Sequence, residues 1–77
     1  MEDKILDILE KVCSSDEVRE DMDINLFDTG LLDSLGVIEL LVEIEDVLGI
    51  KIEPTEVERS LIETPRKIID LLLKLKL

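Results

Sequence analysis

The chain has 77 residues, of which 45% are hydrophobic, and its single aromatic residue is Phe27. Nine basic and twenty acidic residues give a net charge of −11, which argues against nucleic acids and anionic membranes as partners. One cysteine and no histidine exclude an intramolecular disulfide and a Cys/His zinc site. We expect one domain over residues 1–77 with an aliphatic core. Because the sequence shows no basic leader and no apolar run long enough for a membrane span, we expect a cytoplasmic location.

The first predicted element is a helix over residues 3–13. Its apolar residues follow the helical period of one buried face. Cys13 widens that face and is interpreted as a small core residue, because no cation faces it on the helix. The residues of the face are Ile5, Leu6, Ile8, Leu9 and Val12.

Residues 14–33 are predicted to be a long connection between the first two helices. Ser14-Ser15-Asp16-Glu17 can begin a short helical turn, and Asp28-Thr29-Gly30 reads as a tight turn. The apolar residues here recur too irregularly for a helix or strand. We expect them to pin the connection across the helices: Ile24, Leu26, Phe27, Leu31 and Leu32.

Three elements are predicted in the second half. A helix over residues 34–48 ends at Gly49, which suits the left-handed conformation that follows a helix. An extended segment, residues 50–52, leads to a brief third helix over residues 54–60 that opens on Pro54. A fourth helix begins at Thr64-Pro65 and continues to the end, with Lys74 and Lys76 suiting its C-terminus. The fold class is therefore all-α, with four helices and a long first connection.

The helix over residues 34–48 carries apolar residues on two faces. One face is the expected core stripe, made of Val37, Leu40, Leu41, Ile44, Val47 and Leu48. The other face interleaves apolar and acidic residues, namely Leu35, Ile38, Val42, Glu39, Glu45 and Asp46. We interpret this second face as a docking surface for basic partners. The alternative is that the 14–33 connection or the third helix covers its aliphatic side chains.

Asp33-Ser34 stands where the connection gives way to this helix. Either side chain could cap the helix, and capping alone is one interpretation of the pair. However, a serine needs a base to become a nucleophile, the chain has no histidine, and Arg19 and Lys51 are the nearest basic residues in sequence. If Ser34 takes part in chemistry, another protein performs it. The pattern indicates an attachment point rather than an active site.

These residues resemble the phosphopantetheine-carrying proteins, whose signature is Asp-Ser-Leu or Asp-Ser-Met at the start of the second helix. The resemblance implies an acyl-carrier-like four-helix bundle in which Ser34 receives 4′-phosphopantetheine from coenzyme A, with Asp33, Leu35 and Gly36 as its signature neighbours. One branch is closer, the D-alanyl carriers of teichoic acid D-alanylation. That likeness covers residues 24–70 and rests on residues 26–36, 48–50, 58–59 and 63–68. Leu35 and Ile62 depart from that branch, which usually has methionine and an aromatic residue there.

The resemblance further implies a carrier without catalysis of its own. It would hold an acyl group as a thioester on the arm and meet a phosphopantetheinyl transferase, an adenylating ligase for D-alanine and a membrane acyltransferase. The strong negative charge favours a monomer.

Four other functions stay open at this stage. An acyl carrier of fatty-acid or specialised lipid synthesis and a free-standing peptidyl carrier are alternatives within the family. A helical adaptor without a prosthetic group, in which Ser34 only caps the helix, belongs to a different class. The fourth alternative is calcium binding, because Asp21, Asp23 and Asn25 match the first ligands of an EF-hand loop. However, Leu26 and Leu32 stand where such a loop requires glycine and glutamate.

Overall fold

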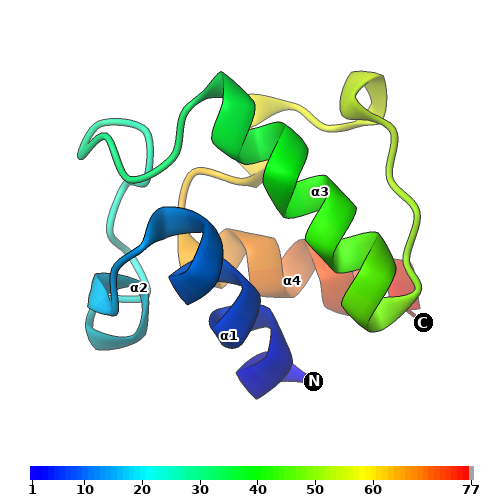
Figure 1. Ribbon diagram of the computed structural model, residues 1–77, viewed down its shortest axis with the longest axis horizontal. Helices are drawn as coiled ribbons and strands as arrows, with labels where there is room; N and C mark the ends of the chain where they lie inside the picture. The colour runs from blue at the N-terminus through cyan, green and yellow to red at the C-terminus, as the bar shows by residue number, and fades with distance from the viewer. Residues whose placement is uncertain (77) are drawn as a thin grey trace.

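The computed structural model describes residues 1–76 and contains only helical elements over that range, so the all-α prediction is confirmed. The α-helices are α1 (Glu2–Cys13), α2 (Glu17–Glu20), α3 (Ser34–Leu48) and α4 (Pro65–Lys76), and the 3₁₀ turns are η1 (Pro54–Glu56) and η2 (Arg59–Leu61). Figure 1 shows the long connection between α1 and α3, interrupted by the single turn of α2. None of the described helices is long and apolar enough to cross a membrane.

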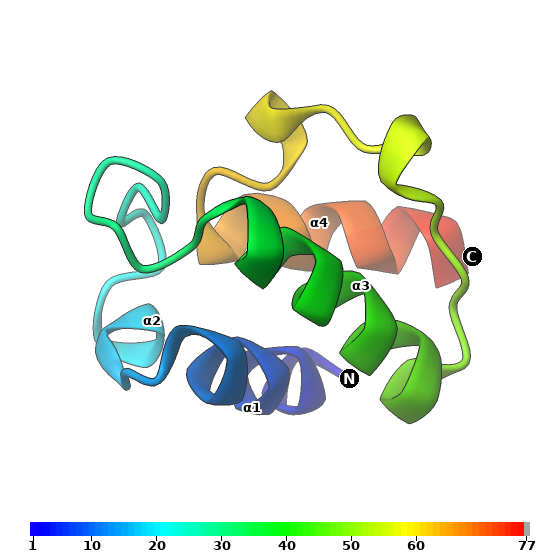
Figure 2. The same ribbon diagram turned by 45° about the horizontal axis from the view of Figure 1, so that its top comes forward.

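The helices surround one aliphatic core. α1 packs against α2, α3 and α4, whereas η1 lies against α3 and η2 against α4. In Figure 2, α3 crosses between α1 and α4, and α1 runs in the opposite direction to both. Cys13 lies in the core, and its burial raises the pKa of the thiol above the ordinary 9.0, as expected for a packing residue. The fully buried side chains are Ile5, Leu9, Val18, Leu26, Leu40, Ile44, Pro65, Ile68 and Leu72.

The connection is pinned to the bundle as predicted. The Leu26 side chain is fully buried, and its backbone N–H donates to the Glu63 carbonyl with an N···O distance of 2.7 Å. The Arg66 N–H donates to the Met22 carbonyl at 3.0 Å, which ties the connection to the start of α4. Gly30 has a φ of 77° and closes the expected turn with a hydrogen bond from its N–H to the Phe27 carbonyl. Buried apolar anchors therefore hold a segment with little helix of its own.

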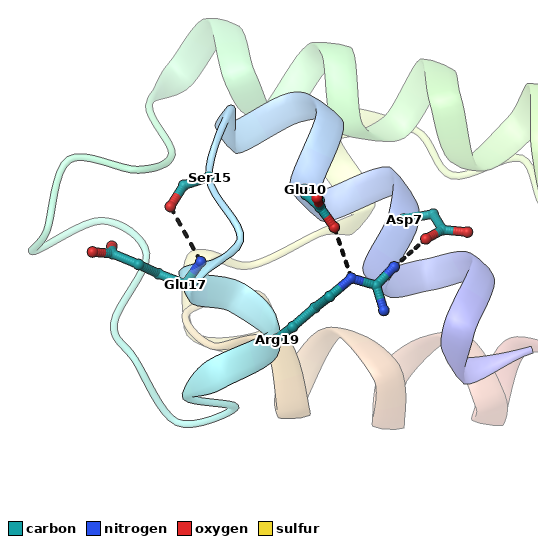
Figure 3. A network of polar contacts seen from close by, with 5 residues as sticks. All are labelled: Asp7, Glu10, Ser15, Glu17 and Arg19. Atoms are coloured by element: carbon teal, nitrogen blue, oxygen red, sulfur yellow. Dashed lines mark hydrogen bonds and ion pairs between the residues drawn. The ribbon is translucent and has the colours of Figure 1, made fainter.

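A polar network fastens α2 to α1 (Figure 3). The Arg19 guanidinium donates to Glu10 through Nε at 2.7 Å and forms a second ion pair with Asp7. Its hydrogen bond to Glu10 is the main cause that raises the pKa of Arg19. The Ser15 hydroxyl accepts from the Glu17 N–H at 3.2 Å, so the turn expected at Ser14-Ser15-Asp16-Glu17 is present.

The prediction of one continuous helix over residues 54–60 is wrong. This segment instead forms two 3₁₀ turns, η1 and η2, which are separated by Val57 and Glu58 in extended conformation. The half-buried Val57 side chain packs against the core, and the extended backbone there lets it do so. Breaking the helix at this point also brings Arg59 over the Phe27 ring, 4.1 Å from its centroid.

Candidate functional site

Asp33 and Ser34 occupy different positions at the start of α3. Asp33 is the N-cap, and its Oδ1 accepts a hydrogen bond from the Gly36 N–H at 2.7 Å. Ser34 is the first helical residue and is exposed. Among residues 1–76 its hydroxyl has no hydrogen-bond partner. The interpretation of Ser34 as the cap is therefore wrong, and its hydroxyl is available to other molecules.

Gly36 lets the preceding segment approach α3 closely. A Cβ at this position would lie 2.9 Å from Leu32 Cδ1 and 3.3 Å from Asp33 Oδ1. Leu32 is buried, so its side chain has little room to move away. The glycine therefore keeps both the Leu32 contact and the cap in place beside Ser34.

A surface depression of about 490 Å³ opens beside Ser34. Its lining comes from the end of the connection, the start of α3 and the segment around η2. The residues are Phe27, Gly30, Leu32, Asp33, Ser34, Val37, Val57, Arg59 and Ile62. Arg59 is its one cation, and Asp33 is its one carboxylate. Asp33 Oδ1 is engaged in the helix cap, and the chain has no histidine that could activate the hydroxyl.

Arg59 carries no functional signal in the sequence, where Glu58-Arg59 is only part of a family likeness. A functional signal would have required knowing that the 54–61 segment folds back over Phe27, which is a tertiary feature.

The second face of α3 is uncovered. Leu35, Ile38 and Val42 are 74%, 45% and 51% exposed, so neither the connection nor the 54–61 segment covers them. The acidic residues of this face, Glu39, Glu45 and Asp46, are exposed as well. The alternative in which these aliphatic residues are covered is therefore wrong.

The core face of α3 is narrower than predicted. Leu40, Leu41 and Ile44 are buried, and Val37 and Leu48 are partly buried against the core. Val47 is 47% exposed, contrary to the prediction. It lies on the rim of the groove between α1 and α3, next to Lys4 and Ile8, where the two helices no longer enclose a side chain.

The candidate calcium ligands are engaged within the protein. Asp23 Oδ1 accepts from Arg66 Nε at 2.8 Å, and this hydrogen bond lowers the pKa of Asp23. Asn25 Oδ1 accepts from the Phe27 and Asp28 N–H groups at 3.0 and 2.9 Å. Among the described residues, no three His, Cys, Asp or Glu side chains gather as a metal site would require. The calcium alternative has no support from this arrangement.

Comparisons with known proteins show the family of the chain. The family described as "Phosphopantetheine attachment site" matches residues 3–72. The chain is 52% identical to a D-alanyl carrier protein from Abiotrophia defectiva over 69 residues, which cover 90% of this chain and 87% of that protein. It is 44% identical to the D-alanyl carrier protein of Bacillus subtilis (strain 168) over 73 residues, 95% of this chain and 94% of that protein. For the protein of the same name from Lacticaseibacillus casei (strain BL23), the identity is 46% over 65 residues, covering 84% of this chain and 80% of the relative.

The cofactor of the family, 4′-phosphopantetheine, fits the residues at the start of α3. Ser34 offers an exposed hydroxyl, and the adjoining depression offers space. The N–H groups of Ser34 and Leu35 have no acceptor among residues 1–76, and they lie at the positive end of the helix dipole, which favours a phosphate. Fold, site and comparisons agree, and the chain belongs to the phosphopantetheine-attachment family, among the D-alanyl carrier proteins.

Proposed function

We propose that this chain carries D-alanine for teichoic acid D-alanylation, on a 4′-phosphopantetheine arm attached to Ser34. The observation that carries the proposal is that the Ser34 hydroxyl, at the start of α3, is exposed and does not cap the helix. The choice of D-alanine rests on the relatives named D-alanyl carrier protein. When bound, the arm supplies a terminal thiol that holds an acyl group as a thioester.

Attachment requires a separate phosphopantetheinyl transferase. Ser34 Oγ forms a new bond to the phosphorus that becomes the arm's phosphodiester, the diphosphate bond of coenzyme A breaks, and adenosine 3′,5′-bisphosphate leaves. The hydroxyl proton goes to a base of the transferase, because the chain has no histidine and Asp33, the one carboxylate in the depression, is engaged in capping α3. Asp33 fixes the first turn of α3 through its hydrogen bond to Gly36, so the hydroxyl is presented from a rigid element.

The second face of α3 supports transient docking. Leu35, Ile38 and Val42 offer aliphatic side chains, and the carboxylates around them attract basic residues of a partner. We propose that the transferase, a D-alanine-adenylating ligase and a membrane acyltransferase use this face in turn. The carboxylates of this face are those of Glu39, Glu45 and Asp46.

The carrier itself acts as one monomeric domain over residues 1–77 in the cytoplasm, and it catalyses none of these steps.

A loading assay tests the cargo. The phosphopantetheine-bearing protein is incubated with D-alanine, ATP and a D-alanine ligase, and separately with malonyl and fatty-acyl donors and their transferases. Intact-mass analysis should show a D-alanyl adduct that hydroxylamine removes, as it does a thioester. Loading from the malonyl or fatty-acyl donors in place of D-alanine would contradict the proposal and favour a lipid-synthesis carrier, and loading with other amino acids by a peptide synthetase domain would favour a peptidyl carrier.

A further inference from the structure

The depression beside Ser34 combines apolar side chains with one cation, Arg59, and one carboxylate, Asp33, whose Oδ1 accepts from the Gly36 N–H. Its volume of about 490 Å³ lies in the range of small-molecule sites. Val37, Val57 and Ile62 line it from α3 and from both sides of η2. Because Ser34 is itself part of the lining, any group attached to its hydroxyl starts inside this depression.

Arg59 is unusual among the cations of this acidic chain. Five of the lysines and arginines are in ion pairs: Lys11, Arg19, Lys51, Arg66 and Lys67. Among the side chains that the structure describes, Arg59, Lys4 and Lys74 lie outside such pairs. Of these three, Arg59 alone lines the depression at Ser34, and the Phe27 ring holds it from below. A fixed guanidinium without a carboxylate partner is suited to bind a phosphate.

We propose that this depression is a resting site for the proximal half of the phosphopantetheine arm. Arg59 binds the phosphodiester together with the N–H groups of Ser34 and Leu35 at the start of α3. The dimethyl segment next to the phosphate packs against Val37, Val57 and Ile62. This inference rests on the proposed attachment at Ser34 and adds a binding site for the arm and a positioning role for Arg59.

The arm binds this site reversibly. It is open to solvent, and Arg59 is exposed, so water competes for every polar contact. Because the arm is tethered to Ser34, which is part of the lining, its local concentration still favours the bound state. The distal thiol projects beyond the depression, since only the phosphate and its neighbouring segment meet the lining. A partner can therefore draw the arm out without unfolding any part of the carrier.

Nuclear magnetic resonance of the modified protein tests the proposal. Wild type, Arg59→Gln, Arg59→Lys and Lys74→Gln are each modified with coenzyme A and a broad-specificity transferase, and modification at Ser34 is verified by mass. Lys74→Gln is the matched control, because it removes an exposed cation without an ion pair from the C-terminal half of α4. In Figure 2 that end of α4 lies at the opposite end of the molecule from the start of α3. The readouts are amide shift differences between modified and unmodified protein, Overhauser contacts from the arm's methyl groups, and the ³¹P shift of the phosphodiester.

In wild type and Lys74→Gln, we expect amide shifts at Gly30, Val57 and Ile62 and methyl contacts to Val57 and Ile62. Arg59→Gln should lose these contacts and move the ³¹P shift toward that of free phosphopantetheine, while Arg59→Lys retains part of both effects. Shifts confined to residues 33–36, or contacts that survive Arg59→Gln, would overturn the resting site while leaving attachment intact. A failure of wild type to gain the arm would overturn the proposed function and this inference together. Unchanged unfolding midpoints verify that each variant is folded.

Discussion

Asp33 and Ser34 are neighbours in sequence but have separate roles at the start of α3. Asp33 caps the helix through its contact with the Gly36 N–H, whereas the Ser34 side chain makes no such bond. Asp33→Ala should therefore lower the free energy of unfolding by about 1 kcal/mol, and Ser34→Ala by less than about 0.5 kcal/mol. Urea denaturation measures both. A loss in Ser34→Ala equal to that in Asp33→Ala would show that the serine stabilises the helix after all.

The ion pair between Asp23 and Arg66 predicts a pH effect. The hydrogen bond from Arg66 lowers the pKa of Asp23 below its ordinary 3.8, so the pair stabilises the fold above that pH. This contribution is lost as the pH falls through the lowered folded-state pKa. Wild type should thus be more stable than Asp23→Asn at neutral pH, and the difference should narrow below pH 3.8.

Thermal denaturation at a series of pH values measures that difference. Arg66→Gln removes the same interaction from the other side and should give the same narrowing. A stability difference that stays constant into the acid range would contradict the assigned role of the pair.

At the scale of elements, α3 presents two valines that differ in surroundings but little in exposure. Val42 is 51% exposed on the second face, and Val47 is 47% exposed on the rim of the α1–α3 groove. If the second face docks the ligase, Val42→Ala should raise the KM for D-alanine loading about fivefold, which corresponds to ~1 kcal/mol. Val47→Ala is the matched control and should leave KM unchanged. Steady-state loading kinetics separate the two, and equal effects of both substitutions would contradict docking through this face.

The sequence predicted the long helices well and the 54–61 segment poorly. α3 has strong signals at both ends, with Asp33 before it and Gly49, at a φ of 70°, after it. Between Pro54 and Leu61 the local signals favour a helix, but burial of Val57 and the contact of Arg59 with Phe27 break it. Both interactions involve residues distant in sequence, so the local periodicity of the segment cannot predict them. The same limitation explains Val47, whose exposure depends on where α1 ends its contact with α3.

For the whole molecule, repulsion among carboxylates should dominate the response to salt. The chain carries a net charge of −11, and its ion pairs lie at the surface. Raising the ionic strength from a few mM to about 0.3 M shortens the screening length and weakens like-charge repulsion more than it weakens these pairs. The thermal unfolding midpoint should therefore rise with sodium chloride. A falling midpoint would mean that the ion pairs outweigh the repulsion.

The site was only partly predictable from sequence at this scale. Ser34 could be proposed from the sequence because the chain has no histidine to activate its hydroxyl, which favours attachment over catalysis. The depression could not be found, because residues from 27 to 62 line it and only the folded chain brings them together. The exposed second face of α3 was predicted from its alternation of aliphatic and acidic residues, which a buried face does not tolerate.

Attachment at Ser34 is tested most directly by intact-mass analysis. Wild type, Ser34→Ala and Ser60→Ala are incubated with coenzyme A and a broad-specificity phosphopantetheinyl transferase, with Ser60 as an exposed serine on η2 for comparison. Wild type and Ser60→Ala should gain the mass of one 4′-phosphopantetheinyl group, and Ser34→Ala should gain none. An unmodified wild type, or a Ser34→Ala protein that gains the group, would contradict the account.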